Sequence, residues 1–77
     1  MDWRARISSD PKVMQGQACI KGTRIPVSVV LDNLAEGHSV EDIVKSYSKL
    51  TAEDVRAAIS YAADTLSERL VPLQDAG

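Results

Sequence analysis

Cysteine and histidine are nearly absent from this chain of 77 residues, which contains one of each, Cys19 and His38. A single thiol cannot close an internal disulfide, and too few further cysteine or histidine side chains accompany it to hold zinc. We therefore expect no metal site and no cofactor. A single core gives a chain of this length only marginal stability, so association with another chain is the stabiliser that remains.

Long apolar runs are also missing. No segment approaches the roughly 20 consecutive apolar residues that span a bilayer, and the first four residues, MDWR, lack the apolar segment of a signal peptide. We expect a cytoplasmic protein that makes no membrane contact.

The residue sets that support catalysis are missing as well. Cys19 needs a nearby base to act as a nucleophile, and His38 lies beyond a predicted helix without a visible third partner. Burial as a small apolar residue is the simpler prediction for Cys19, and an exposed turn position is the simpler one for His38. No paired carboxylates occur in an apolar setting, and Lys21-Gly22-Thr23 has the wrong residue order for a phosphate-binding P-loop. The sequence predicts no catalytic residue and no enzyme.

Charge is divided unevenly along the chain. Residues 1–24 carry five basic and two acidic side chains, whereas residues 25–77 carry four basic and nine acidic ones. The formal net charge of −2 therefore hides a basic N-terminal segment in front of an acidic remainder.

After residue 25, apolar residues recur at the intervals typical of α-helices. Pro26 suits the first turn of a helix and Gly37 suits its end. Ser39 and Thr51 are each followed three residues later by an aspartate, the spacing of a capping box at a helix start. The apolar stripes predicted for the three helices are Val27, Val30, Leu31 and Leu34, then Val40, Ile43, Val44 and Tyr47, then Val55, Ala58, Ile59, Ala62, Leu66 and Leu70.

These signals predict a mainly α fold, a three-helix homeodomain-like or helix-turn-helix-like bundle. Its parts are a basic arm and loop with short extended or β segments (residues 1–25), a helical body (residues 26–71) and a flexible tail (residues 72–77). The second and third helices have the proportions of a helix-turn-helix. Glu53 and Asp54 open the third helix, where carboxylates favour the helix dipole but would repel DNA phosphates.

Three stretches resemble the domain-of-unknown-function 433 family. They are Arg6-Ile7 followed by Asp10-Pro11, then GQACIKGTRIPV at residues 16–27, then LTAEDVRAAISYA at residues 50–62. The resemblance implies a small helical domain similar to helix-turn-helix folds, often encoded beside a PIN-like nuclease as the antitoxin of a toxin–antitoxin pair. One departure is Ala18, where family members often carry proline.

The loop formed by residues 21–24 is the first candidate site. Glycine lets the backbone approach a ligand closely, and Lys21 and Arg24 supply donors for phosphate or carboxylate. The alternative is a tight turn in which Arg24 pairs with an acid of the helical body, such as Asp32 or Glu36.

Other candidates are more peripheral. Arg4 and Arg6, close to Trp3, form an arm that suits a phosphate backbone or a minor groove, or else a frayed terminus. Val29 extends the apolar surface of the first helix. This extra surface indicates either a dimer or partner interface, or a small core that surrounds the helix on more than one side. Near the C-terminus three apolar side chains mark either a frayed helix end or a docking segment: Leu70, Val71 and Leu73.

Two functional hypotheses follow. In the first, the protein is the antitoxin of a PIN-like nuclease toxin, and Arg24 and Lys21 occupy the toxin's acidic cleft. In the second, it is a small DNA-binding regulator whose phosphate contacts come from Arg4, Arg6, Lys21 and Arg24. A homodimer is expected in both cases.

Overall fold

The computed structural model describes residues 1–9, 12 and 16–67 of the chain. Along the sequence its elements are a 3-10 helix η1 (Trp3–Ala5), strands β1 (Ile7–Ser9) and β2 (Ala18–Ile20), and helices α1 (Val27–Ala35), α2 (Val40–Ser46) and α3 (Ala52–Ser67). The mainly helical fold with a short β segment is confirmed. The predicted docking residues Leu70, Val71 and Leu73 lie outside the described residues, as does the predicted end of the third helix.

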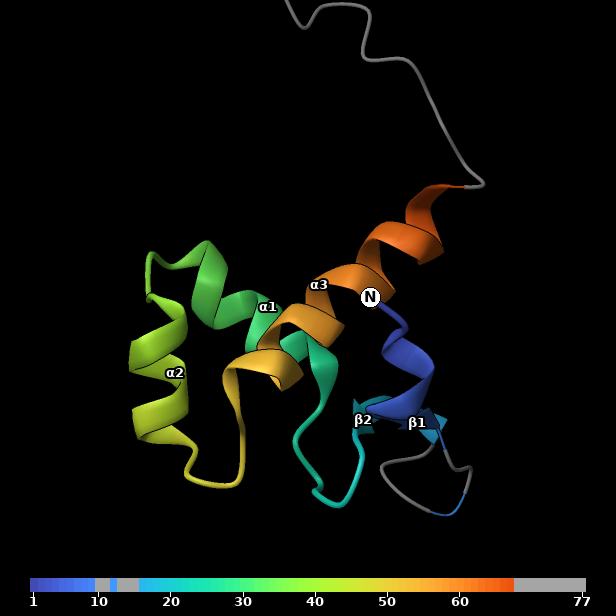
Figure 1. Cartoon of the computed structure of the whole chain (residues 1–77), viewed down its shortest axis with the longest axis horizontal. Coiled ribbons are helices and arrows are strands. Elements are labelled where there is room, and N and C mark those ends of the chain that lie inside the picture. The colour runs from blue at the N-terminus through green and yellow to red at the C-terminus, as the bar shows by residue number, and fades with distance from the viewer. Residues whose placement is uncertain (10–11, 13–15, 68–77) are drawn as a thin grey trace, which may run out of the picture.

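The two strands form a small antiparallel sheet beside the helices (Figure 1). Ile7 pairs with Ile20, and Ser8 pairs with Cys19. Ile7 and Ile20 pair across the two strands, share one face of the sheet and belong to the hydrophobic core. Cys19, the residue before Ile20, is on the opposite face and is also buried.

Local sequence signals set where the helices begin. Pro26, in an extended conformation, is the N-cap of α1, one position before the predicted first turn. Ser39 and Asp42 exchange hydrogen bonds as a capping box at the start of α2. Thr51 and Asp54 do the same before α3, with nitrogen–oxygen distances of 2.9 and 3.2 Å. Both predicted capping boxes are present.

Glycine ends the first helix as predicted. Gly37 has a φ of 96°, in the left-handed region, and its N–H donates to the carbonyl of Leu34. A left-handed residue at this position satisfies helix carbonyls that have no partner within the helix.

The hydrophobic core lies where the sheet and the three helices meet, and it contains Val30, Ile43 and Val55. From residue 26 onward, two core residues were not among the predicted stripe positions, Leu50 and Ala57. Two stripe predictions were wrong, because Ile59 is 45% exposed and Leu66 is 66% exposed. At the level of Ile59 the buried side of α3 is formed by Ala57 and Ala58, so Ile59 lies off the buried face. Leu66 is near the end of α3, a part of the helix that extends beyond α1 and α2 in Figure 1. No helix in the described part of the chain is long and apolar enough to cross a membrane.

Candidate functional site

The basic turn (residues 21–24) follows β2 directly and is held by hydrogen bonds at both ends. The Lys21 N–H donates to the carbonyl of Arg6 at 2.7 Å. The Thr23 hydroxyl donates to the Ile20 carbonyl at 2.8 Å and accepts from the Ile25 N–H at 3.0 Å. Gly22 occupies the left-handed region, with a φ of 79°. The turn is therefore a fixed support for the side chains it carries.

The two predicted cations of this turn are both exposed. Arg24 forms no ion pair with Asp32, Glu36 or any other acidic side chain of the described residues. The alternative in which Arg24 pairs with Asp32 or Glu36 is therefore wrong. The Lys21 ammonium donates to the backbone carbonyl of Arg4 at 3.3 Å, a contact that leaves its charge without a counterion.

Arg6 lies elsewhere, against the start of α3. Its guanidinium contacts the Asp54 carboxylate at 3.1 Å and the Glu53 carboxylate at 3.4 Å. The Arg6 side chain is 35% exposed and the Asp54 side chain 11% exposed. Arg6 thus links the N-terminal segment to α3 instead of fraying, and a phosphate contact by Arg6 would have to compete with two carboxylates.

Arg4 and Trp3 form a small cluster on the C-terminal half of α3. The Trp3 ring meets Tyr61 edge to face, with ring centroids 4.9 Å apart and an interplanar angle of 85°. The Arg4 guanidinium lies 4.7 Å from the Trp3 ring centroid and 3.7 Å from the Asp2 carboxylate, and it remains exposed. Trp3 is thus a packing residue, and the outer side of its ring is shared with Arg4.

The remaining sequence candidates are distributed over the fold. Val29 is half-buried in α1. Cys19 is a buried free thiol in β2, and His38 is exposed between α1 and α2, as expected for both. No group of three or more metal-ligating side chains gathers within the part of the chain that the structure describes.

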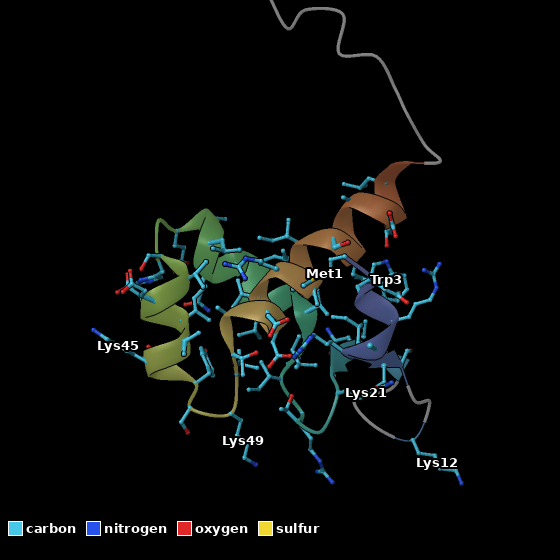
Figure 2. All side chains as sticks on the ribbon, in the orientation of Figure 1. Met1, Trp3, Lys12, Lys21, Lys45 and Lys49 are labelled. Atoms are coloured by element: carbon cyan, nitrogen blue, oxygen red, sulfur yellow. The ribbon has the colours of Figure 1, made fainter. Side chains whose placement is uncertain are left out.

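Sequence reasoning missed Lys49. This lysine lies in the turn between α2 and α3, is exposed, and forms no ion pair with a described residue (Figure 2). A single basic residue between two predicted helices is a weak indication of a binding site. Its position relative to the basic turn depends on the fold and cannot be deduced from the sequence.

A two-stranded sheet packed on three helices places the chain among small, mainly helical domains. Residues 7–62 match the family described as protein of unknown function DUF433, and the chain belongs to this family. The family resemblance drawn from the sequence is thus confirmed.

Two relatives extend the comparison. A crystal structure of a DUF433 member protein from Anabaena variabilis superposes with a TM-score of 0.72 at 36% identity, covering 83% of this chain and 62% of that one. The uncharacterized protein y4eO from Sinorhizobium fredii is 39% identical over 59 residues. That match covers 77% of this chain but only 27% of the relative, so the chain spans about a quarter of y4eO.

Proposed function

We propose that this protein acts in the cytoplasm as a binding protein, the antitoxin of a PIN-like nuclease toxin, and that it neutralises the toxin by direct contact. The observation that carries the proposal is Arg24, an exposed arginine without a counterion on a turn fixed by Thr23. No acidic side chain of residues 1–9 and 16–67 forms an ion pair with this guanidinium.

The chemistry of the partner suits this side chain. PIN-like nucleases hold metal with clustered carboxylates, and a guanidinium pairs with a carboxylate through two parallel hydrogen bonds. Lys21, beside Arg24 on the same turn, adds a second positive charge. Inserted into the acidic cleft, the turn would occupy the space that metal and substrate require.

The proposal requires a PIN-like nuclease to be encoded beside this protein, and Arg24→Ala tests it in the complex with that nuclease. We expect the dissociation constant of the complex to rise by about tenfold or more, because a central arginine anchor is lost. Helicity measured by circular dichroism should stay unchanged, since Arg24 has no partner within the described chain.

Arg56→Ala is the matched control, because Arg56 is an exposed arginine on α3, away from the basic turn. Equal nuclease inhibition by the wild type, Arg24→Ala and Arg56→Ala would remove Arg24 from the mechanism.

A small DNA-binding regulator is the second candidate, favoured by the exposed cations Arg4, Lys21 and Arg24. A homodimer would double these contacts, and the half-buried Val29 is a candidate for its interface. A gel-shift titration with the upstream DNA tests this function, because binding through several cations weakens steeply as salt rises. Absence of retardation at low salt, with or without the nuclease, would argue against it.

A further inference from the structure

Two turns that are distant in sequence lie along one edge of the molecule. Figure 1 shows the connection from β2 to α1 and the connection from α2 to α3 both at the lower edge of the helical body. We call this edge the loop end and define it as residues 21–25 and 47–51. Lys21 and Lys49 are labelled toward this edge in Figure 2. The loop end thus presents cations from two separate turns, with Arg24 on the first and Lys49 on the second.

Several acidic side chains of the described residues belong to elements at the opposite edge or are paired with Arg6. Glu36 follows α1, and Glu41 and Asp42 open α2, at the upper edge of the body in Figure 1. Glu53 and Asp54 are both paired with Arg6. Within the described residues, Arg24 and Lys49 form no ion pair with a carboxylate, so both cations are available to an anionic partner.

The backbone of the basic turn adds further donors. The N–H groups of Gly22 and Arg24 donate to no other group among the described residues, whereas those of Lys21, Thr23 and Ile25 are all used. Thr23 lies between these two residues and its N–H donates to the Ile20 carbonyl, so the N–H groups of Gly22 and Arg24 are two separate donors, each able to bind an acceptor oxygen of a partner. A Cβ atom added to Gly22 would have no other atom of the described residues within 4 Å, so the space beside the turn is open.

We propose that the loop end binds an acidic surface of a protein partner, with Arg24 and Lys49 as anchors from two turns. The inference rests on the proposed function for the identity of the partner. It adds Lys49 as a second anchor, so that the expected interface includes both turns of the loop end. It favours protein over DNA because Arg6 and the N-terminal segment hold the first turn of α3. That turn is the part of a reading helix that enters the major groove, and its exposed carboxylate on Glu53 would face the phosphates.

Lys49→Gln tests the inference in a complex of the full chain with the PIN-like nuclease of the proposed function. We expect the dissociation constant to rise about fivefold at low salt, as for a charge at the edge of an interface, and the difference to shrink as salt screens it. Lys45→Gln is the matched control, since Lys45 is an exposed lysine that Figure 2 shows on the side of α2 away from the basic turn. It should change the dissociation constant by less than about twofold. Loss of affinity in Arg24→Ala with none in Lys49→Gln would overturn the inference and leave the proposed function standing.

A second measurement does not depend on the nuclease. Amide chemical shifts of the full chain are followed during titration with an oligoglutamate peptide and, separately, with a short DNA duplex at the same ionic strength. We expect oligoglutamate to shift the amides of Arg24 and Lys49. If this occurs while the nuclease does not bind, the proposed function is wrong and the acidic protein partner stands. Tighter binding of the duplex through the same amides, or no shift with either probe, would overturn the inference.

Discussion

Arg6 is the single side chain that most directly couples the N-terminal segment to the helices. It reaches Asp54, 48 positions later in the sequence, and Asp54 is 8% exposed. One Asp54 oxygen accepts from the Thr51 N–H at 2.9 Å, and the other accepts from Arg6. Without Arg6, a largely buried carboxylate would keep its helix cap but lose its cation.

Arg6→Ala should therefore lower the free energy of unfolding by about 1–2 kcal/mol, less than for a fully buried pair because solvent screens the partly exposed guanidinium. Urea unfolding followed by circular dichroism measures this. Arg4→Ala, which removes an exposed arginine two residues earlier, should leave the urea midpoint nearly unchanged. Equal midpoints for Arg6→Ala and Arg4→Ala would show that the pair with Asp54 does not stabilise the fold.

The sequence could not show which arginine has an internal partner. Arg6 and Arg24 both lie in the basic N-terminal segment and both have acids available in the helical body. Only the antiparallel pairing of β1 with β2 brings Arg6 to the start of α3 while leaving Arg24 in solvent. The candidate turn was predictable from its glycines and cations, whereas its lack of a counterion depends on contacts between distant segments.

Among the elements, α2 is the shortest helix and depends on its capping box. The Asp42 carboxylate accepts from the backbone N–H of Ser39 at 3.0 Å. This bond, together with the Ser39 hydroxyl, lowers the pKa of Asp42 below its ordinary value of 3.8, and the nearby charges of His38 and Lys45 act in the same direction. A lowered pKa in the folded state means that the ionised carboxylate stabilises the fold.

Asp42→Asn should accordingly lower stability at neutral pH and have less effect in acid. The contribution of Asp42 is present above its unfolded pKa and is lost as the pH falls through the lower, folded-state pKa. Urea midpoints of the wild type and the variant, measured from neutral pH to below pH 3.8, should converge. Glu41→Gln controls for loss of another first-turn charge, and a gap between wild type and Asp42→Asn that is constant with pH would contradict the prediction.

Helix positions were more predictable than the faces the helices bury. Capping boxes and the terminal glycine act within a few residues, so Ser39, Thr51 and Gly37 located the helix ends. Burial of Ile59 and Leu66 was predicted from periodicity alone, and it failed: Ala57 and Ala58 form the buried face beside Ile59, and Leu66 lies where α3 extends beyond α1 and α2. Leu50 is buried from a turn, a position that no helical period indicates.

At the scale of the whole molecule, the first residues of the chain contact α3, the last described helix. The Trp3 ring contacts Tyr61, and the Ser60 hydroxyl donates to the carbonyl of Met1. With the Arg6–Asp54 pair, these contacts fix η1 and β1 along α3. The N-terminal segment is thus part of the folded body, and the basic turn is held between a strand and a helix that are both anchored.

Trp3→Ala should lower the free energy of unfolding by about 1–3 kcal/mol, because a half-buried aromatic ring and its edge-to-face contact are lost. Trp3→Phe keeps an aromatic ring at this position but removes the indole N–H that donates to the Asp64 carboxylate at 2.5 Å, so it should recover only part of that loss. Trp3 is the one tryptophan of the chain, so its fluorescence and the circular dichroism of the helices should change at the same urea concentration. A fluorescence transition at lower urea would show that η1 detaches while the helices remain folded.

Burial of the chain's one thiol also determines how the protein can be labelled. Cys19 is 3% exposed in β2, so alkylating dyes reach it slowly while the fold is intact. A new cysteine at an exposed position on either turn would react first, and the native residue would not have to be replaced. Fluorophores or spin labels could then be attached one at a time to a protein whose interior is unaltered.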